Sequence, residues 1–286
     1  MRPSELILNK DKSIYHLGIH PDQVGDIIIT VGDPHRVDMV SRHFDKIIVR
    51  KAVREFVTHS GYIKDKRLTV ISTGIGTDNI DIVLNELDAL INCNLETGST
   101  NKALRSLEII RIGTSGAIQS DIPVDTFIAS EYAIGFDALQ PFYNYHMDDK
   151  ETRLFKAAST LLSDSKIDIT PSVAKSSLEL ELDKIKLTKG ITLTAPGFYA
   201  PQGRHIRLQP RYPDMIDQLS ALQLDELRCT NLEMETAGIY TLSNLLGHKA
   251  ISLNAILANR ANGIFSQDPQ ATVNKLIDGV IGYLRS

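Results

Sequence analysis

The chain has 286 residues, 42% of them hydrophobic, and a net charge of −4 at neutral pH. That is enough for one large buried core, and because composition does not shift along the chain we predict a single domain over residues 1–286. The arginines are dispersed and no stretch approaches the roughly 20 apolar residues that span a bilayer, so we expect a cytoplasmic protein that binds neither nucleic acid nor membrane.

Apolar runs typical of buried strands recur along the chain, with amphipathic helical segments between several of them. The strand-like runs are residues 27–31, 68–72, 107–112, 127–130, 191–195 and 250–258. Apolar residues at helical spacing predict helices within residues 80–91, 237–246 and 273–284. Because the strand runs are continuously apolar, we predict an α/β fold with a central mixed sheet flanked by helices.

Two segments depart from this pattern. Residues 92–106 are polar and read as a surface insertion, whose role the sequence leaves open. Residues 178–182 alternate leucine with glutamate, which predicts a half-exposed strand.

The two cysteines, Cys93 and Cys229, are isolated, so we expect reduced thiols. No spacing of histidines or cysteines predicts a metal site.

Two arginines follow strand-like runs beside glycines. In Arg111–Gly116 (RIGTSG) the glycines would let backbone N–H groups converge in a turn, and Arg111 would add a planar cation for an anion. A plain strand-to-loop turn with an arginine at its rim explains this stretch equally well. The run 27–31 repeats the design, because Gly32 and Pro34 would place Arg36 one turn into a helix.

Two carboxylates, Glu233 and Glu235, flank Met234 just before a predicted helix. They would stabilise the helix N-terminus or face a ligand, and one residue can do both. Other ligand motifs are incomplete. The strand–glycine segment at residues 74–79 lacks the third glycine of a dinucleotide fingerprint, no phosphate-binding P-loop occurs, and Ser115 does not lie in a hydrolase nucleophile elbow.

Eight segments, in the same order and with compatible spacing, resemble the nucleoside phosphorylases of the uridine phosphorylase group. Three of them are the segments just described, residues 32–36, 111–116 and 231–236. The other five are residues 15–18, 54–56, 72–76, 198–204 and 259–260. The resemblance extends from Tyr15 to Arg260. It implies the nucleoside phosphorylase fold and a pentosyltransferase that converts uridine and phosphate reversibly to uracil and ribose 1-phosphate in pyrimidine salvage.

The resemblance also implies a role for each matching residue. Phosphate would be held by Gly32, Arg36, Arg111 and Thr114, with Arg54 from the neighbouring subunit. Ribose would contact Thr114, Glu233, Met234 and Glu235, with Tyr15 and His16 from that subunit. The base would contact Phe198, Gln202, Arg204, Leu257, Ala258 and Arg260. Of these, Arg204, Gln202 and Glu235 are the expected catalytic residues.

Asn259 and Arg260 stand where purine-specific relatives carry an aspartate that protonates the purine ring, which favours a pyrimidine substrate. A hydrolytic nucleosidase, a purine nucleoside phosphorylase and a catalytically idle nucleoside-binding relative remain as alternatives. The arginines around an anion argue against the hydrolase, and the intact set of matching residues argues against the idle relative.

The shared site implies a homodimer or a higher homo-oligomer, and the sequence does not decide between a dimer and a hexamer. No cofactor is expected, because inorganic phosphate is itself the co-substrate. Some family members bind a monovalent cation at the dimer interface through a glutamate that matches Glu55 and a serine where this chain has Asn79, so that site stays open. Tolerance for thymidine or deoxyuridine is also open.

Overall fold

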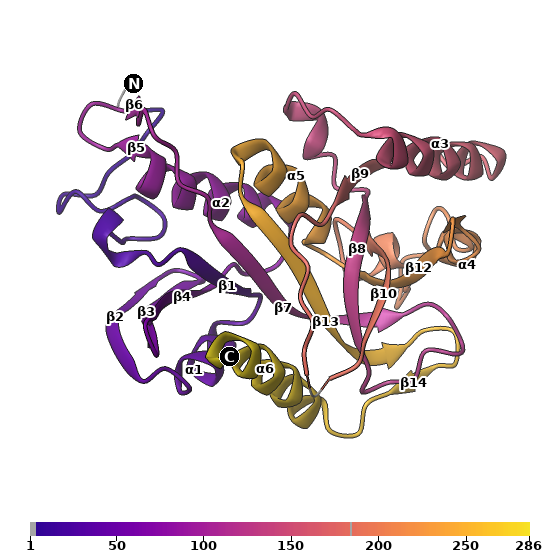
Figure 1. Ribbon diagram of the computed structural model, residues 1–286. Coiled ribbons are helices and arrows are strands. Elements are labelled where there is room, and N and C mark those ends of the chain that lie inside the picture. Colours follow the sequence, from indigo (N-terminus) through magenta and orange to yellow (C-terminus); the bar gives the residue numbers. More distant parts are fainter. Residues whose placement is uncertain (1–3, 184) are drawn as a thin grey trace.

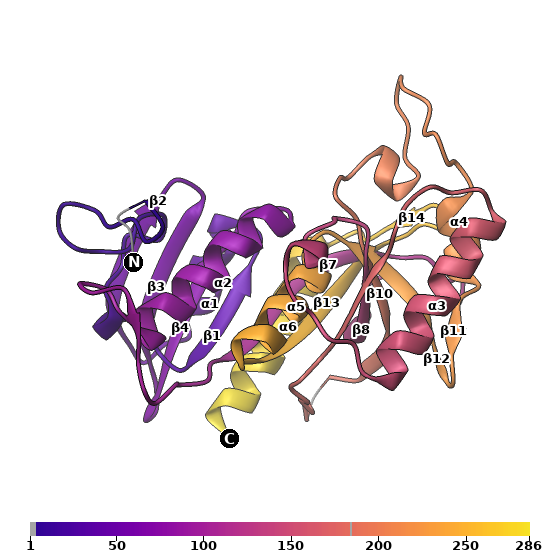
Figure 2. The same cartoon turned by 90° about the horizontal axis from the view of Figure 1, so that it is seen from above.

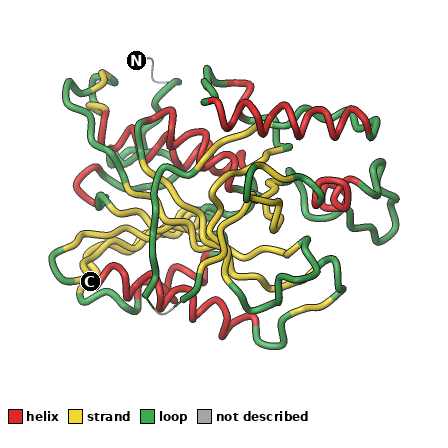
Figure 3. Tube along the Cα trace, turned by 45° about the vertical axis from the view of Figure 1, so that its right-hand side comes forward, coloured by secondary structure: helices red, strands yellow, loops and turns green. Residues whose placement is uncertain are grey.

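The computed structural model describes residues 4–183 and 185–286; residues 1–3 and 184, which the predicted domain includes, lie outside the described part. A mixed sheet of 12 strands runs through these residues and helices cover both of its faces (Figures 1 and 3). The predicted fold class, an α/β fold with a central mixed sheet flanked by helices, is confirmed.

The sheet follows the order β11-β12-β10-β8-β13-β7-β1-β4-β3-β2, with β9 beside β8 and β14 beside β13. The strands are β1 (Ile27–Val31), β2 (Lys46–Val53), β3 (Phe56–Ile63), β4 (Lys66–Ser72), β7 (Glu108–Ala117), β8 (Phe127–Gly135), β9 (Ser172–Lys175), β10 (Leu187–Thr194), β11 (Gln223–Leu224), β12 (Leu227–Glu233), β13 (Lys249–Asn259) and β14 (Ile264–Phe265). An additional pairing of β12 with β7 closes β7, β13, β8, β10 and β12 into a ring.

Alternate residues of the inner strands face different helix layers, which explains why these strands are continuously apolar. In β1, Ile29 packs with α1 (Pro34–Ser41) and α6 (Pro269–Arg285), whereas Ile28 packs with α2 (Thr77–Asn92) and α5 (Thr236–Leu246). Figure 1 shows the two pairs on opposite sides of the sheet. The third core cluster joins α3 (Asp149–Asp164) and α4 (Met215–Ser220) to β8, β10 and β12.

The expected glycine turn at residues 111–116 is wrong, because this whole stretch lies inside β7. The parallel ladder with β13 pairs Arg111 with Ser252 and continues to Ala117, and β12 pairs with the end of β7 from the other side. The ladder with β13 engages one edge of this stretch, while on its other edge β1 pairs only as far as Arg111 and β12 begins at Gly116. Residues 112–115 therefore form a strand whose second edge has no strand partner within the described part of the chain.

The half-exposed strand expected at residues 178–182 is also wrong. Its alternation is real, because Leu180 and Leu182 are buried against the α6 core while the glutamates between and before them are exposed. Both edges of β13 are already paired, with β7 and β8, so this segment crosses the sheet as an extended connection without a ladder among the described residues. The polar segment 92–106 contains a small hairpin of β5 (Cys93–Asn94) and β6 (Ser99–Thr100).

Candidate active site

A cavity of about 750 Å³ opens where β1, β7 and β12 end near α1 and α5. It gathers side chains from the widely separated segments singled out in the sequence. Predicted site residues that line it are Gly32, Arg36, Arg111, Thr114, Phe198, Gln202, Arg204, Glu233, Met234, Glu235, Leu257 and Ala258. Ser115, whose hydroxyl the sequence offers as a donor for an anion, lines it too, as do Ile75 and Phe265, to which the sequence assigned no role.

Four predicted site residues do not line this cavity: Tyr15, His16, Arg54 and Arg260. The first three form a separate cluster, in which the Arg54 guanidinium carbon lies 5.8 Å from the Tyr15 ring centroid and the rings of Tyr15 and His16 meet edge to face at 4.8 Å. The Glu86 carboxylate fixes His16, contacting its Nδ1 at 2.5 Å and its backbone N–H. Within one chain these three side chains stay outside the cavity.

Arg36 is positioned by the turn between β1 and α1. Asp33 caps α1 by accepting a 2.9 Å hydrogen bond from the His35 N–H, and Pro34 takes the first helical position. Arg36 then donates from Nη1 to the Ile112 carbonyl, at 3.1 Å, which brings it beside β7. Burial, followed by the neighbouring Arg111, lowers the pKa of Arg36. Two adjacent guanidiniums at one cavity wall favour an anion there.

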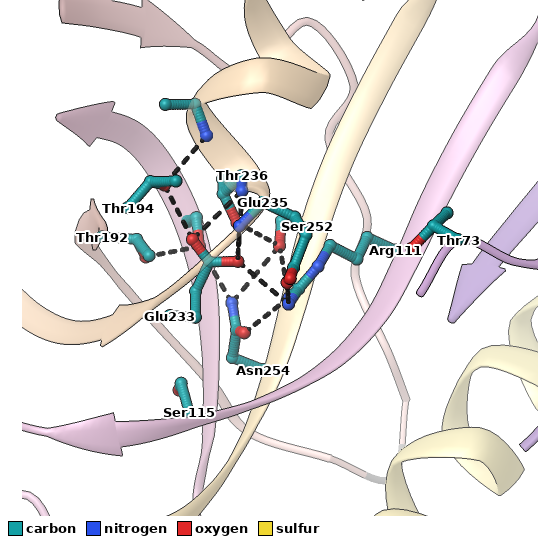
Figure 4. A network of polar contacts seen from close by, with 12 residues as sticks. Thr73, Arg111, Ser115, Thr192, Thr194, Glu233, Glu235, Thr236, Ser252 and Asn254 are labelled. Carbon is teal, nitrogen blue, oxygen red and sulfur yellow. Dashed lines mark hydrogen bonds and ion pairs between the residues drawn. The ribbon is translucent and has the colours of Figure 1, made fainter. Parts of the chain in front are cut away.

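Arg111 is 5% exposed and its guanidinium is surrounded by acceptors (Figure 4). Its Nη2 lies 2.6 Å from Glu235 Oε2 and 2.9 Å from Glu233 Oε2. Its Nη1 donates to Asn254 Oδ1 at 2.8 Å and to Ser252 Oγ at 3.2 Å. Burial alone would lower the pKa of Arg111, but Glu233 and then Glu235 outweigh it and raise that pKa. Arg111 is therefore firmly cationic.

The two glutamates at the β12–α5 junction have different surroundings. Glu233 accepts hydrogen bonds from the backbone N–H groups of Glu235, at 2.9 Å, and Thr236, at 3.0 Å, and from the Thr194 hydroxyl at 2.7 Å. It therefore caps α5. Glu235 instead accepts from the Gly76 N–H at 2.8 Å, and burial raises its pKa although Arg111 opposes this. Glu235 has fewer protein partners and keeps acceptor capacity for a ligand.

An aromatic ring and a cation lie together at Phe198 and Arg204. The Arg204 guanidinium carbon is 3.9 Å from the Phe198 ring centroid, and Arg204 Nη1 donates to the Phe198 carbonyl at 2.8 Å and to Gln202 Oε1. Arg260 Nη1 donates to the Gln202 carbonyl at 3.0 Å. Burial and the neighbouring Arg260 lower the pKa of Arg204 to about 10, which leaves it charged at neutral pH.

The segment that carries these side chains, between β10 and α4, stands away from the sheet (Figure 2). Ile206 and Leu208 in this segment are exposed and Phe198 itself is 52% exposed, whereas Gln202 is buried. The pocket formed by Phe198, Gln202 and Arg204 is therefore open on one side, which lets a planar ligand enter.

Sequence reasoning missed Ser252 and Asn254. Both are fully buried on β13, two residues apart, and so lie on one face of the strand. The signal was present: they are the polar residues of the otherwise apolar run 250–258. A buried asparagine needs partners, and two polar residues at a spacing of two indicate that partners lie on one side.

Within the described ranges there is no group of three or more histidine, cysteine, aspartate or glutamate side chains suited to a metal ion. Nor does that part of the chain include a helix with the length and apolar character needed to cross a bilayer.

The chain matches the phosphorylase superfamily over residues 26–278 and belongs to it. A uridine phosphorylase of Thermococcus kodakarensis is 29% identical over 88% of this chain and 80% of its own length. A DeoD-type purine nucleoside phosphorylase of Buchnera aphidicola is 22% identical over 92% of this chain and 95% of its own. Among solved structures, a Trypanosoma brucei nucleoside phosphorylase that shows uridine phosphorylase activity has a TM-score of 0.86 and 27% identity, with 98% of this chain and 100% of that chain covered.

Proposed function

We propose that this protein catalyses the reversible phosphorolysis of uridine to uracil and ribose 1-phosphate, as a pentosyltransferase of pyrimidine salvage. One observation carries the proposal: a single cavity holds the adjacent arginines Arg36 and Arg111, the carboxylate Glu235 and the Phe198–Arg204 pair. These groups suit, in turn, a phosphate, a ribose diol and a planar base. The kinship with uridine phosphorylases supports the same reaction.

The proposed chemistry needs no protein nucleophile, because bound phosphate attacks the anomeric carbon from the face opposite the base and inverts it. As the N-glycosidic bond breaks, negative charge develops on the base and positive charge on the ribose ring. Arg204 and Gln202 would stabilise the first, and phosphate faces the second. Holding phosphate in line with the anomeric carbon, through Arg36 and Arg111, supplies much of the rate.

The base preference rests on Gln202 and Arg204, because Asn259 does not face the cavity. Asn259 Nδ2 donates to the Gln119 and Ile122 carbonyls, each at 2.8 Å. The amide therefore binds the loop between β7 and β8 and is not available to a ligand. A pocket built to hydrogen-bond the edge of uracil rejects a base that leaves those groups unpaired. Purine phosphorolysis is the second candidate, favoured by the similarity to DeoD-type enzymes.

The proposal includes a cytoplasmic homodimer, alone or within a larger assembly, that works without a resident cofactor. The cluster of Tyr15, His16 and Arg54 would then complete the site of the partner subunit, Arg54 at phosphate and His16 at the ribose 5′-hydroxyl. Its separation from the cavity within one chain supports this arrangement. A two-fold interface would complete both sites at once.

The test is release of free base from uridine, thymidine, inosine and adenosine, each with and without phosphate. We expect phosphate-dependent cleavage of uridine that far exceeds cleavage of inosine or adenosine. Arg36→Ala should abolish turnover or raise the phosphate KM strongly. Arg42→Ala is the matched control, since Arg42 directly follows the same helix, is exposed and donates to Asn274 Oδ1. Undiminished uridine cleavage without phosphate would identify a hydrolase, and equal efficiency on inosine would contradict the base assignment.

A further inference from the structure

The terminal nitrogens of Arg111 make three hydrogen bonds and a further ion pair. Nη1 donates to Ser252 and Asn254 and Nη2 donates to Glu235, while Glu233 Oε2 lies 2.9 Å from Nη2 as an ion pair. Gly113 provides the space, because a Cβ there would come within 1.8 Å of Arg111 Nη1. We call Glu233, Glu235, Ser252 and Asn254, with the space above Gly113, the Arg111 seat, because together they hold the guanidinium in one position.

Asn254 supplies a neutral amide to the Arg111 seat, and two serine hydroxyls fix the orientation of that amide. Its Nδ2 donates to Ser130 Oγ at 3.1 Å and to Ser252 Oγ at 3.3 Å, so its Oδ1 must face Arg111. Asn254 is fully buried and does not line the cavity. Its amide therefore acts on a ligand only indirectly, and Arg111 is the cavity residue that it contacts directly.

The side chains that contact Asn254 on the side away from Arg111 lead back to the cavity through the ring of strands. Ser130 Oγ lies 2.6 Å from Thr192 Oγ1, which donates to Asn231 Oδ1 at 2.9 Å. Asn231 Nδ2 in turn donates to Ser115 Oγ, at 2.9 Å, and Ser115 lines the cavity. Buried networks in which each member is satisfied favour one arrangement over its alternatives.

We propose that Asn254 is a positioning residue for phosphorolysis, acting through Arg111, and that its neutral amide keeps this part of the site suited to phosphate. Two carboxylates already face the one guanidinium. An amide oxygen holds Nη1 without adding a third negative charge, whereas an aspartate of the same shape would add one close to the incoming dianion. This inference rests on the proposed function.

Asn254→Asp separates this role from a merely structural one. The Ser252 hydroxyl can turn to donate to a carboxylate, whereas the Ser130 hydroxyl is already donated to Thr192, because Thr192 donates to Asn231. The substitution therefore keeps the shape and loses one hydrogen bond, a cost that the melting temperature reports separately from the kinetics. If the amide only filled the core, the kinetic constants would not change. If it acts through Arg111, we expect the phosphate KM to rise about tenfold or more, while the uridine KM changes much less, because the added charge repels phosphate selectively.

The experiment measures kcat, the two KM values and the melting temperature for the full-length wild type, Asn254→Asp, Ser252→Ala and Asn244→Asp. Asn244 is the control: a partly buried asparagine on α5 whose Nδ2 donates to the Lys175 carbonyl and Tyr145, away from the cavity. Asn244→Asp should lower the melting temperature and leave the phosphate KM unchanged. Ser252→Ala removes the other acceptor of Nη1 and should lower kcat/KM for phosphate several-fold.

A folded Asn254→Asp protein with the wild-type phosphate KM would overturn the inference. If that variant does not fold, Ser252→Ala decides, and unchanged kcat/KM for phosphate would reject positioning through Nη1. The wild type keeps the two proposals apart. Phosphate-independent cleavage by the wild type rejects the phosphorolysis itself, whereas a phosphate-dependent wild type with insensitive variants rejects only the role of Asn254.

Discussion

Arg111 Nη2 and Glu235 Oε2 lie 2.6 Å apart inside the protein, so the phosphate arginine and the ribose carboxylate of the proposed site hold each other. Glu235 also accepts the Gly76 N–H, which ties the pair to the start of α2. A displacement of either ligand group therefore moves the other. Effects of substitutions here should appear in the kinetics of both substrates.

Glu233→Gln should mainly lower the stability of the protein, whereas Glu235→Gln should mainly lower its activity. Glu233 caps α5 and neutralises Arg111, so we expect its substitution to cost the more stability, on the order of 3 kcal/mol for a broken buried pair. Glu235 faces the cavity, so its substitution should lower kcat/KM for uridine about 100-fold or more, with the smaller change in stability. Chemical denaturation and steady-state kinetics measure the two. The reverse order would exchange the roles assigned to these residues.

Gly113→Ala should reproduce the loss of Arg111 without removing it. Gly113 lies inside β7 with an ordinary strand backbone, so alanine is compatible with the strand, but its Cβ would occupy the position of the Arg111 guanidinium. We expect a folded protein with kcat/KM for phosphate reduced about 100-fold. Gly282→Ala, where a Cβ meets nothing within 4 Å, is the control. Near-normal phosphate kinetics in Gly113→Ala would show that the guanidinium does not need this seat.

Arg204→Ala should reduce kcat for uridine much more than it raises the uridine KM. The charge that Arg204 meets develops on the base only as the glycosidic bond breaks, so its contribution belongs to the transition state. Arg211→Ala, on the same segment beside Tyr212, is the control. A change confined to KM would place Arg204 in ground-state binding alone.

The periodicity of the sequence predicted the strands and helices that bury apolar residues, because those patterns are local. The run 250–258 became β13, and residues 80–91 and 273–284 became the cores of α2 and α6. The predictions that were wrong, the turn at residues 111–116 and the strand at residues 178–182, depended on strand partners far apart in the sequence. Glycines and hydroxyls at residues 113–116 read as a turn, yet β13 pairs along this whole stretch, β12 pairs with its last residue, and both keep it in a strand.

The residues of the candidate site also fall into two sets: those that a local motif identified and those that only long-range contacts reveal. Motif order identified most of the side chains that line the cavity, because each belongs to a short run of residues that is recognisable in the sequence by itself. Ser252 and Asn254 lie within a strand and contact Arg111 across the sheet, at a sequence separation of more than 100 residues. No local pattern encodes such a contact, although two polar residues in an apolar strand indicated that one exists.

The protein should lose stability as the pH falls below about 6.5, in part because of His59. Burial, and then the Arg50 guanidinium, lowers the pKa of His59 below its ordinary value of 6.5, although Asp38 opposes this. The unfolded chain then binds the proton more tightly than the folded one. The stabilising contribution is complete above the unfolded value and is lost as the pH falls toward the folded one.

His59→Gln should make this loss shallower, because glutamine does not titrate and can still meet the Ser41 hydroxyl, which lies 2.8 Å from His59 Nδ1. The measurement is the free energy of unfolding of both proteins at several pH values between about 8 and about 5. Parallel curves for wild type and variant would show that His59 contributes nothing to the acid limb.

If the proposed homodimer forms, the Arg54→Ala and Glu235→Ala variants should each be nearly inactive alone and should regain activity when mixed. Arg54 lies outside the cavity of its own chain, so it serves phosphate only if a partner receives it, whereas Glu235 belongs to its own cavity. A mixed dimer has one site with native Arg54 and native Glu235 and one site that lacks both. Unfolding the two variants together and refolding them should therefore restore up to one native site per mixed dimer.

The control for this experiment is each variant refolded alone, and the formation of mixed dimers is followed with a tag on one chain. Recovery of phosphate-dependent uridine cleavage only in the mixture would establish that two chains build each site. If tagged mixed dimers form and remain inactive, each chain builds its site alone. The cluster of Arg54 with Tyr15 would then be a surface contact, with no part in binding phosphate.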